Sequence, residues 1–145
     1  MRDFNHTVNV LVKAFLNDTL EHENCAACAV GNIICASGIN LKDGFEANAW
    51  FYTICSLIRK DSQRAAFTTP TKQRTGLAQM AATGYTIKEL NLIELAFESE
   101  PEYIESGVNE DRMFNGLMKV VDVLADIHGI SLESKEEAKL LFVKI

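Results

Sequence analysis

The sequence is poor in residues that interrupt helices, and it has no long apolar run. Only two prolines, Pro70 and Pro101, occur among 145 residues, so long helices can form on either side of each. No stretch approaches the roughly 18 consecutive apolar residues of a membrane-spanning helix. The N-terminus lacks the basic, apolar and small-residue pattern of a secretory signal. We therefore expect a cytoplasmic protein without a membrane segment.

Motifs of the common enzyme classes are missing as well. The sequence contains no Gly-x-Ser-x-Gly, Walker or Rossmann glycine pattern. A c-type haem is excluded because Ala29 stands where the CxxCH motif requires histidine. A calcium loop starting at Glu98 is excluded because Tyr103 and Asn109 would occupy the positions of the turn glycine and the bidentate glutamate. An enzymatic hypothesis therefore depends on the thiols alone, and we lean against an enzyme.

Basic residues are also scarce. The 14 lysines and arginines face 20 acidic residues, which gives a net charge of −6. This balance makes a nucleic-acid partner unexpected, because nucleic-acid-binding surfaces are basic. Residues 59–74 are the exception, with five basic residues and one acidic residue. No aromatic interleaving or glycine cradle accompanies these charges, so we interpret the segment as a solvated surface.

Helical periodicity dominates what the sequence does contain. Hydrophobic residues make up 48% of the chain, enough for the core of one domain. Phe4, Val8 and Leu11 show the helical spacing most clearly, and no β-hairpin signal separates alternating strands. We expect helices at about residues 4–20, 25–37, 43–59, 70–83, 87–98, 110–128 and 134–143, the last carrying Leu140, Leu141 and Val143.

Candidate N-caps support these boundaries. The expected capping residues are Asp3, Asn24, Asp43, Thr69, Thr86, Asn109 and Ser134. Thr86 and Glu89 form a capping-box pattern, and Pro70 suits the first turn after Thr69. Residues 99–109 are expected to be a polar loop. The sequence predicts a single all-α domain over residues 1–145, with six or seven short helices in an orthogonal, bundle-like array.

Two segments together resemble a known family. CAACAVGN at residues 25–32 and GYTIKELNLIELAF at residues 84–97 are similar to paired motifs, CxxCAVGN and GY[ST]xxEL..IE..F, of a family of small uncharacterised bacterial proteins. The resemblance spans most of residues 4–130 and implies no activity. Some relatives carry the label of a sodium-translocating NADH:quinone reductase subunit. This chain lacks the C-x₄-C-x₂-C run that its plant-type iron–sulfur cluster requires.

The main cluster of chemically reactive side chains is His22, Cys25 and Cys28. In one interpretation these residues bind zinc, and His128 or Cys35 supplies the fourth ligand of a closed site. In a second, the CxxC pair at a helix N-terminus carries out redox chemistry. In a third, both cysteines are small apolar residues packed at a tight helix crossing. The third is our expectation, so no cofactor is predicted, and zinc is the metal to test.

Two further polar residues interrupt apolar helix faces. Glu94 lies between Ile93 and Phe97, and a buried carboxylate there needs a partner such as Arg112 or a backbone amide. Asn32 is expected to hydrogen-bond two helices together. In the absence of a catalytic constellation, we expect a non-enzymatic protein-interaction or regulatory module that binds a protein partner or a second copy. The alternative is a zinc-stabilised or thiol-redox protein centred on His22, Cys25 and Cys28.

Overall fold

The computed structural model describes residues 3–22, 24–42, 44–58, 60, 61, 63, 68–99, 103, 104, 107, 108 and 112–143. Within these residues the protein is an all-α domain, as the sequence predicts. Its helices are α1 (Phe4–Leu16), α2 (Ala29–Ala36), α3 (Gly44–Thr53), α5 (Pro70–Ala82), α6 (Ile87–Phe97), α7 (Arg112–His128) and α8 (Leu132–Leu140). A π-helical turn, η1 (Ile54–Ile58), continues α3. No helix in this described part is long and apolar enough to cross a membrane.

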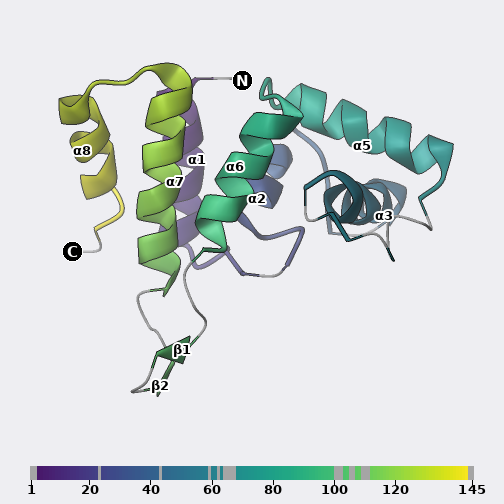
Figure 1. Ribbon diagram of the computed structural model, residues 1–145, viewed down its shortest axis with the longest axis horizontal. Helices are drawn as coiled ribbons and strands as arrows, with labels where there is room; N and C mark the ends of the chain where they lie inside the picture. The colour runs from purple at the N-terminus through teal and green to yellow at the C-terminus, as the bar shows by residue number, and fades with distance from the viewer. Residues whose placement is uncertain are drawn as a thin grey trace.

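The helices form two packed groups that meet at α6 (Figure 1). On one side, α7 lies between α6 and α8 and also contacts α1; on the other, α3 packs against α5. The shorter α2 contacts α1, α6 and α5, so it lies at the centre of the domain. Fully buried side chains from each group, including Leu11, Ile34, Trp50, Ile93 and Leu117, form one continuous core.

Glycine allows the closest approach of the helices on each side. A Cβ atom at Gly76 of α5 would overlap the side chain of Thr53 on α3. A Cβ atom at Gly116 of α7 would lie 2.7 Å from the carbonyl oxygen of Phe97, the last residue of α6. Both contacts are closer than a side chain allows, so the absence of a side chain sets the two crossing distances.

Several predicted caps are confirmed. The Asp3 side chain accepts a hydrogen bond from the backbone N–H of His6, and Thr69 accepts one from that of Lys72. Thr86 and Glu89 form the complete reciprocal capping box at the start of α6. These contacts are local, which explains why sequence spacing alone identifies them. The predicted caps Asp43 and Asn109 lie outside the described residues.

The second helix starts four residues later than predicted. Asn24 caps only a turn, with its side chain accepting from the N–H of Ala26. The cap of α2 is Cys28, whose sulfur accepts a hydrogen bond from the N–H of Gly31. The first helix also ends early, at Leu16, because Asp18 adopts a positive φ of 57° that cannot continue a helix.

The last helix is shifted toward the N-terminus relative to the prediction. It begins at Leu132, because Ser131 is the cap and its side chain accepts from the N–H of Ser134. Ala138 and Phe142 are the buried residues of this segment. The large apolar side chains that the sequence analysis assigns to this helix, Leu140, Leu141 and Val143, are exposed. The position of this helix is fixed by α7, where Asp122 forms ion pairs with Lys139 at 2.9 Å and Lys135 at 3.3 Å.

A short antiparallel pairing lies within the segment expected to be a polar loop. Strand β1 (Tyr103–Ile104) pairs with β2 (Gly107–Val108), with Tyr103 opposite Val108. Tyrosine, isoleucine and valine are strand-forming residues, and the surrounding polar residues mask this preference in the sequence. The pairing spans two residues per strand and leaves the all-α class unchanged.

The ion pairs of Asp122 predict an acid-dependent contribution to stability. Burial alone would raise the pKa of Asp122, but hydrogen bonds and charge from Lys139 and Lys135 outweigh it and lower the pKa below its usual value. The stabilisation is therefore present above the unfolded carboxylate pKa of about 3.9, and it is lost as the pH falls through the lower folded value. Asp122→Asn should lower the melting temperature at neutral pH and have little effect at about pH 2.

Thermal melts across this pH range test the prediction. Asp126→Asn is a matched control, because Asp126 is an exposed carboxylate on the same helix. A difference between wild type and Asp122→Asn that stays constant with pH would contradict a role for the carboxylate charge.

Candidate functional site

The CxxC segment forms a single turn before α2. The carbonyl oxygen of Asn24 accepts hydrogen bonds from the N–H groups of Ala27 at 3.0 Å and Cys28 at 2.8 Å. The side chain of Asn32 donates to the carbonyls of Ala27 at 2.9 Å and Cys28 at 3.0 Å. The expectation that Asn32 bonds two helices together is therefore wrong, because it fixes the turn to its own helix.

The carbonyl oxygen of Cys25 connects this turn to the rest of the core. It accepts a hydrogen bond of 2.7 Å from the indole Nε1 of Trp50 on α3. It also lies against α2, because a Cβ atom at Gly31 would be only 2.5 Å from it. Glycine at position 31 thus lets the turn lie directly on the helix, within reach of the indole.

Cys28 and Glu94 form a buried thiol–carboxylate pair. Cys28 is fully buried and Glu94, on α6, is 3% exposed. Helix α6 packs against α2, which brings the Glu94 carboxylate close enough to influence the Cys28 thiol. Burial raises the pKa of the Cys28 thiol well above its usual value, and the negative charge of Glu94 raises it further. Cys28 is therefore a protonated thiol at neutral pH, and it donates a hydrogen bond to the carbonyl oxygen of Cys25 at 3.7 Å.

The sequence analysis predicts correctly that Glu94 is buried. The suggested partner Arg112 pairs instead with Glu98, at 3.5 Å. The pairing of residues 28 and 94 is not predictable from local spacing, since it depends on how α2 and α6 pack.

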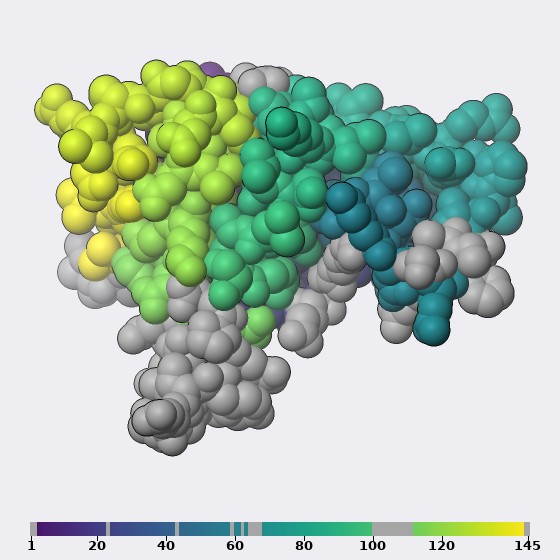
Figure 2. All heavy atoms as spheres, in the orientation of Figure 1, coloured from purple at the N-terminus to yellow at the C-terminus, as the bar shows by residue number. Residues whose placement is uncertain are grey.

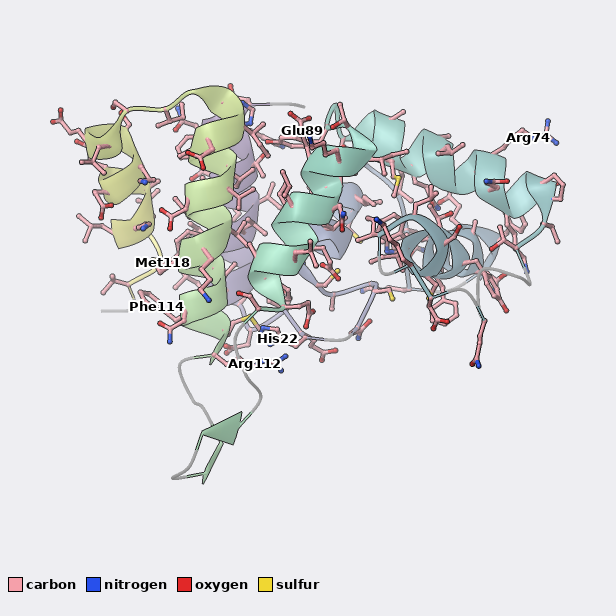
Figure 3. All side chains as sticks on the ribbon, in the orientation of Figure 1. His22, Arg74, Glu89, Arg112, Phe114 and Met118 are labelled. Atoms are coloured by element: carbon pink, nitrogen blue, oxygen red, sulfur yellow. The ribbon has the colours of Figure 1, made fainter. Side chains whose placement is uncertain are left out.

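His22 lies at the C-terminal end of α6. Its ring stacks on that of Phe97, with ring centroids 4.4 Å apart, and its Nε2 lies 3.1 Å from the Phe97 carbonyl oxygen. The last carbonyl groups of a helix have no partner within the helix, so this contact satisfies one of them. Figure 3 shows His22 near Arg112, at the end of α7 that faces the C-terminus of α6. His22 is therefore a helix-capping residue of α6.

His128 lies at the other end of the domain. Its Nε2 is 2.8 Å from the hydroxyl of Tyr85, which is itself 2.7 Å from the hydroxyl of Thr7. Tyr85 precedes α6 and Phe97 ends it, and a helix of 11 residues is about 16 Å long. His22 and His128 therefore cannot bind one metal ion.

The remaining cysteines do not complete a metal site either. Cys35 is exposed on α2, Cys55 is buried in η1, and all four cysteines are thiols rather than disulfides. Among the described residues, no three histidine, cysteine, aspartate or glutamate side chains converge where a metal could bind. The proposed ligands His22, Cys25, Cys28 and His128 are thus not brought together. Of these residues, Cys25 and Cys28 lie together in one turn, and Glu94 of α6 interacts with Cys28.

Two contacts of the candidate site residues are not predicted from the sequence. The indole of Trp50 donates a hydrogen bond to the carbonyl of Cys25. The ring of Phe97 stacks on His22. No local signal identifies either contact, because both join segments that are distant in sequence.

Comparisons with known proteins add no assignment. No protein-family model, curated protein or solved structure matches the chain. The resemblance to the CxxCAVGN family remains a prediction from the sequence.

Gly31→Ala should destabilise the protein, because the added methyl group would clash with the backbone of Cys25 and Ala26. We expect a loss of about 1–3 kcal/mol from this overpacking, measured by denaturant unfolding, together with a change in Trp50 fluorescence. Cys35→Ala, at an exposed position of the same helix, is the control and should change stability by about 0.5 kcal/mol or less. Wild-type stability in Gly31→Ala would show that the turn does not depend on this contact.

A Cys25→Ala/Cys28→Ala variant should remain folded and helical. Loss of two small sulfur groups and one weak cap predicts about 1–2 kcal/mol of destabilisation and a melting temperature lower by about 4–8 °C. A chelator should not change the melting temperature of either protein, and elemental analysis should find no stoichiometric zinc. An unfolded variant with a chelator-sensitive, zinc-containing parent would establish the metal interpretation instead.

Proposed function

We propose that this protein is a non-enzymatic protein-interaction or regulatory module whose contact surface is formed by α8 and the residues after it. The observation that carries the proposal is the outward orientation of this segment's large apolar side chains. Leu132 and Leu140 are 69% exposed, Leu141 is 51% exposed and Val143 is 49% exposed. Burial of the part of these side chains that is still exposed would favour association through the hydrophobic effect.

This surface lies at an accessible edge of the molecule. Figure 2 shows α8 and the following residues along the left edge of the view, on the opposite side of the domain from α3 and α5. A groove of about 330 Å³ separates α8 from α1. Apolar side chains of Val8, Ala138 and Leu141 line it, and Asn5, Asn9 and Glu137 provide polar groups. The groove therefore offers more polar than apolar surface, and the exposed leucines of α8 lie beside it.

A second copy of the chain is the occupant that we propose. Lys135 and Lys139 are ion-paired to Asp122 of α7, so the contact surface of α8 is defined by its exposed apolar side chains. In a twofold dimer the same patch contacts itself, so it must be self-complementary, and an apolar patch meets this condition. The net charge of −6 supports a protein partner over nucleic acid.

The proposed compartment is the cytoplasm. All four cysteines are thiols, and a reducing compartment preserves that state. A zinc-stabilised protein is the less supported alternative, because the suggested ligands do not converge.

Sedimentation velocity over a wide range of protein concentration tests this function. We expect a reversible dimer for the wild type and a monomer for Leu140→Glu/Leu141→Glu, because buried charge at these positions opposes association. Leu95→Glu is the matched control, since Leu95 is a 58% exposed leucine on α6, and it should dimerise like the wild type.

A wild type that is monomeric at every concentration would overturn the proposed dimer. Dissociation by Leu95→Glu but not by the α8 variant would move the interface to α6. Far-ultraviolet circular dichroism of each variant confirms that the comparison is made between folded proteins.

A further inference from the structure

The geometry of the CxxC turn is compatible with a disulfide. Residues 24–28 form one helix-like turn, closed by the hydrogen bonds from Ala27 and Cys28 to the carbonyl of Asn24. Residues three apart in such a turn lie on the same side, with Cβ atoms about 5–6 Å apart. A disulfide requires Cβ atoms at about 3.5–4.5 Å, so a small movement of the turn is sufficient to join Cys25 and Cys28.

The two thiols have different access to solvent. Cys25 is partly exposed, whereas Cys28 is fully buried beneath it. A small oxidant arriving from solvent therefore meets Cys25 first. Cys28 is in the position of a resolving thiol, which reacts with an already oxidised neighbour.

A proton acceptor is in place for the buried thiol. A resolving thiol must lose its proton when it attacks, and burial of Cys28 prevents direct transfer to bulk water. The carboxylate of Glu94 is 3% exposed on α6, which packs against α2, and it interacts with the Cys28 thiol inside the same buried region. Nearby Glu98 is bound to Arg112 at 3.5 Å, so the two glutamates on this end of α6 have different roles.

We propose that Cys25 and Cys28 are a peroxide-sensitive dithiol site in which Glu94 accepts the proton of Cys28. The Cys25 thiolate attacks hydrogen peroxide, the O–O bond breaks, and a sulfenic acid and water are formed after one proton is taken up. The sulfur of Cys28 then attacks the Cys25 sulfur and passes its proton to Glu94. The S–O bond breaks, and the departing hydroxide takes that proton to leave as water. Two thiols lose two electrons, and one peroxide becomes two waters.

The disulfide changes contacts that hold the turn in place. The Cys28 sulfur moves from its position as the cap that accepts from Gly31, at 3.3 Å. Cys25 moves as well, and its carbonyl accepts the indole hydrogen bond of Trp50. Trp50 is the single tryptophan of the chain, so its fluorescence reports closure of the disulfide directly.

The experiment uses the full chain with Cys35→Ser and Cys55→Ala, which leaves the two proposed thiols. The added reagent is hydrogen peroxide at one equivalent. We expect a mass loss of two hydrogens, the disappearance of both thiols, and a two-phase change in Trp50 fluorescence. In a Cys28→Ser version the reaction should stop at the sulfenic acid, which dimedone traps. Peptide mapping of the oxidised wild-type chain then tests whether the same disulfide joins Cys25 and Cys28 when Cys35 and Cys55 are unchanged.

Glu94→Gln keeps the shape of the side chain and removes the proton acceptor. It should slow the second phase by about 100-fold, the usual contribution of a general base, and leave the rate of sulfenic acid formation unchanged. Glu98→Gln is the matched control and should leave both phases unchanged. Failure to form a disulfide between residues 25 and 28 would overturn the site. Closure of Glu94→Gln at the wild-type rate would overturn the role of Glu94.

Discussion

The packing of the 24–28 turn on Gly31 is the contact on which the centre of this domain depends. Because no side chain separates the turn from α2, the carbonyl of Cys25 lies close to the helix and within reach of the Trp50 indole. One backbone group thereby joins the segment after α1 to α2 and α3. The same packing buries Cys28 where the carboxylate of Glu94 approaches it. The packing of the core and the geometry of the candidate site thus both depend on the absence of a side chain at Gly31.

The elements that the sequence predicts best are those fixed by local contacts. The capping box of Thr86 and Glu89 connects residues three apart, and its geometry is the same in every helix. The start of α2 was misplaced because the cap is a cysteine sulfur, a residue type not associated with capping. The orientation of α8 does not follow from its largest apolar residues, because Leu140 and Leu141 are exposed. Ion pairing to Asp122 and burial of Phe142 decide the orientation instead.

The sequence identifies the residues of the candidate site, but it does not show which of them contact each other. The spacing of Cys25 and Cys28 and the burial of Glu94 follow from sequence periodicity. Which residue faces Glu94 does not, because α2 and α6 meet through packing between segments about 50 residues apart in the sequence. His22 and His128 illustrate the same limit. Both are residues that often bind metals, and the fold uses each at a different helix end, with Phe97 and Tyr85 as partners.

The hydrogen bonds of Tyr85 have a consequence for the order in which the protein is assembled during synthesis. Thr7 and Tyr85 are 78 positions apart, and Tyr85 and His128 are a further 43 apart. A ribosome adds roughly 5–20 residues per second, so His128 is made about 6–24 s after Thr7. Once α2 has been made, α1 has α2 as a neighbour but must wait for α7. The apolar face of α1 is therefore fully covered only after α7 has left the ribosome, so α1 packs completely more than 100 residues after its own synthesis.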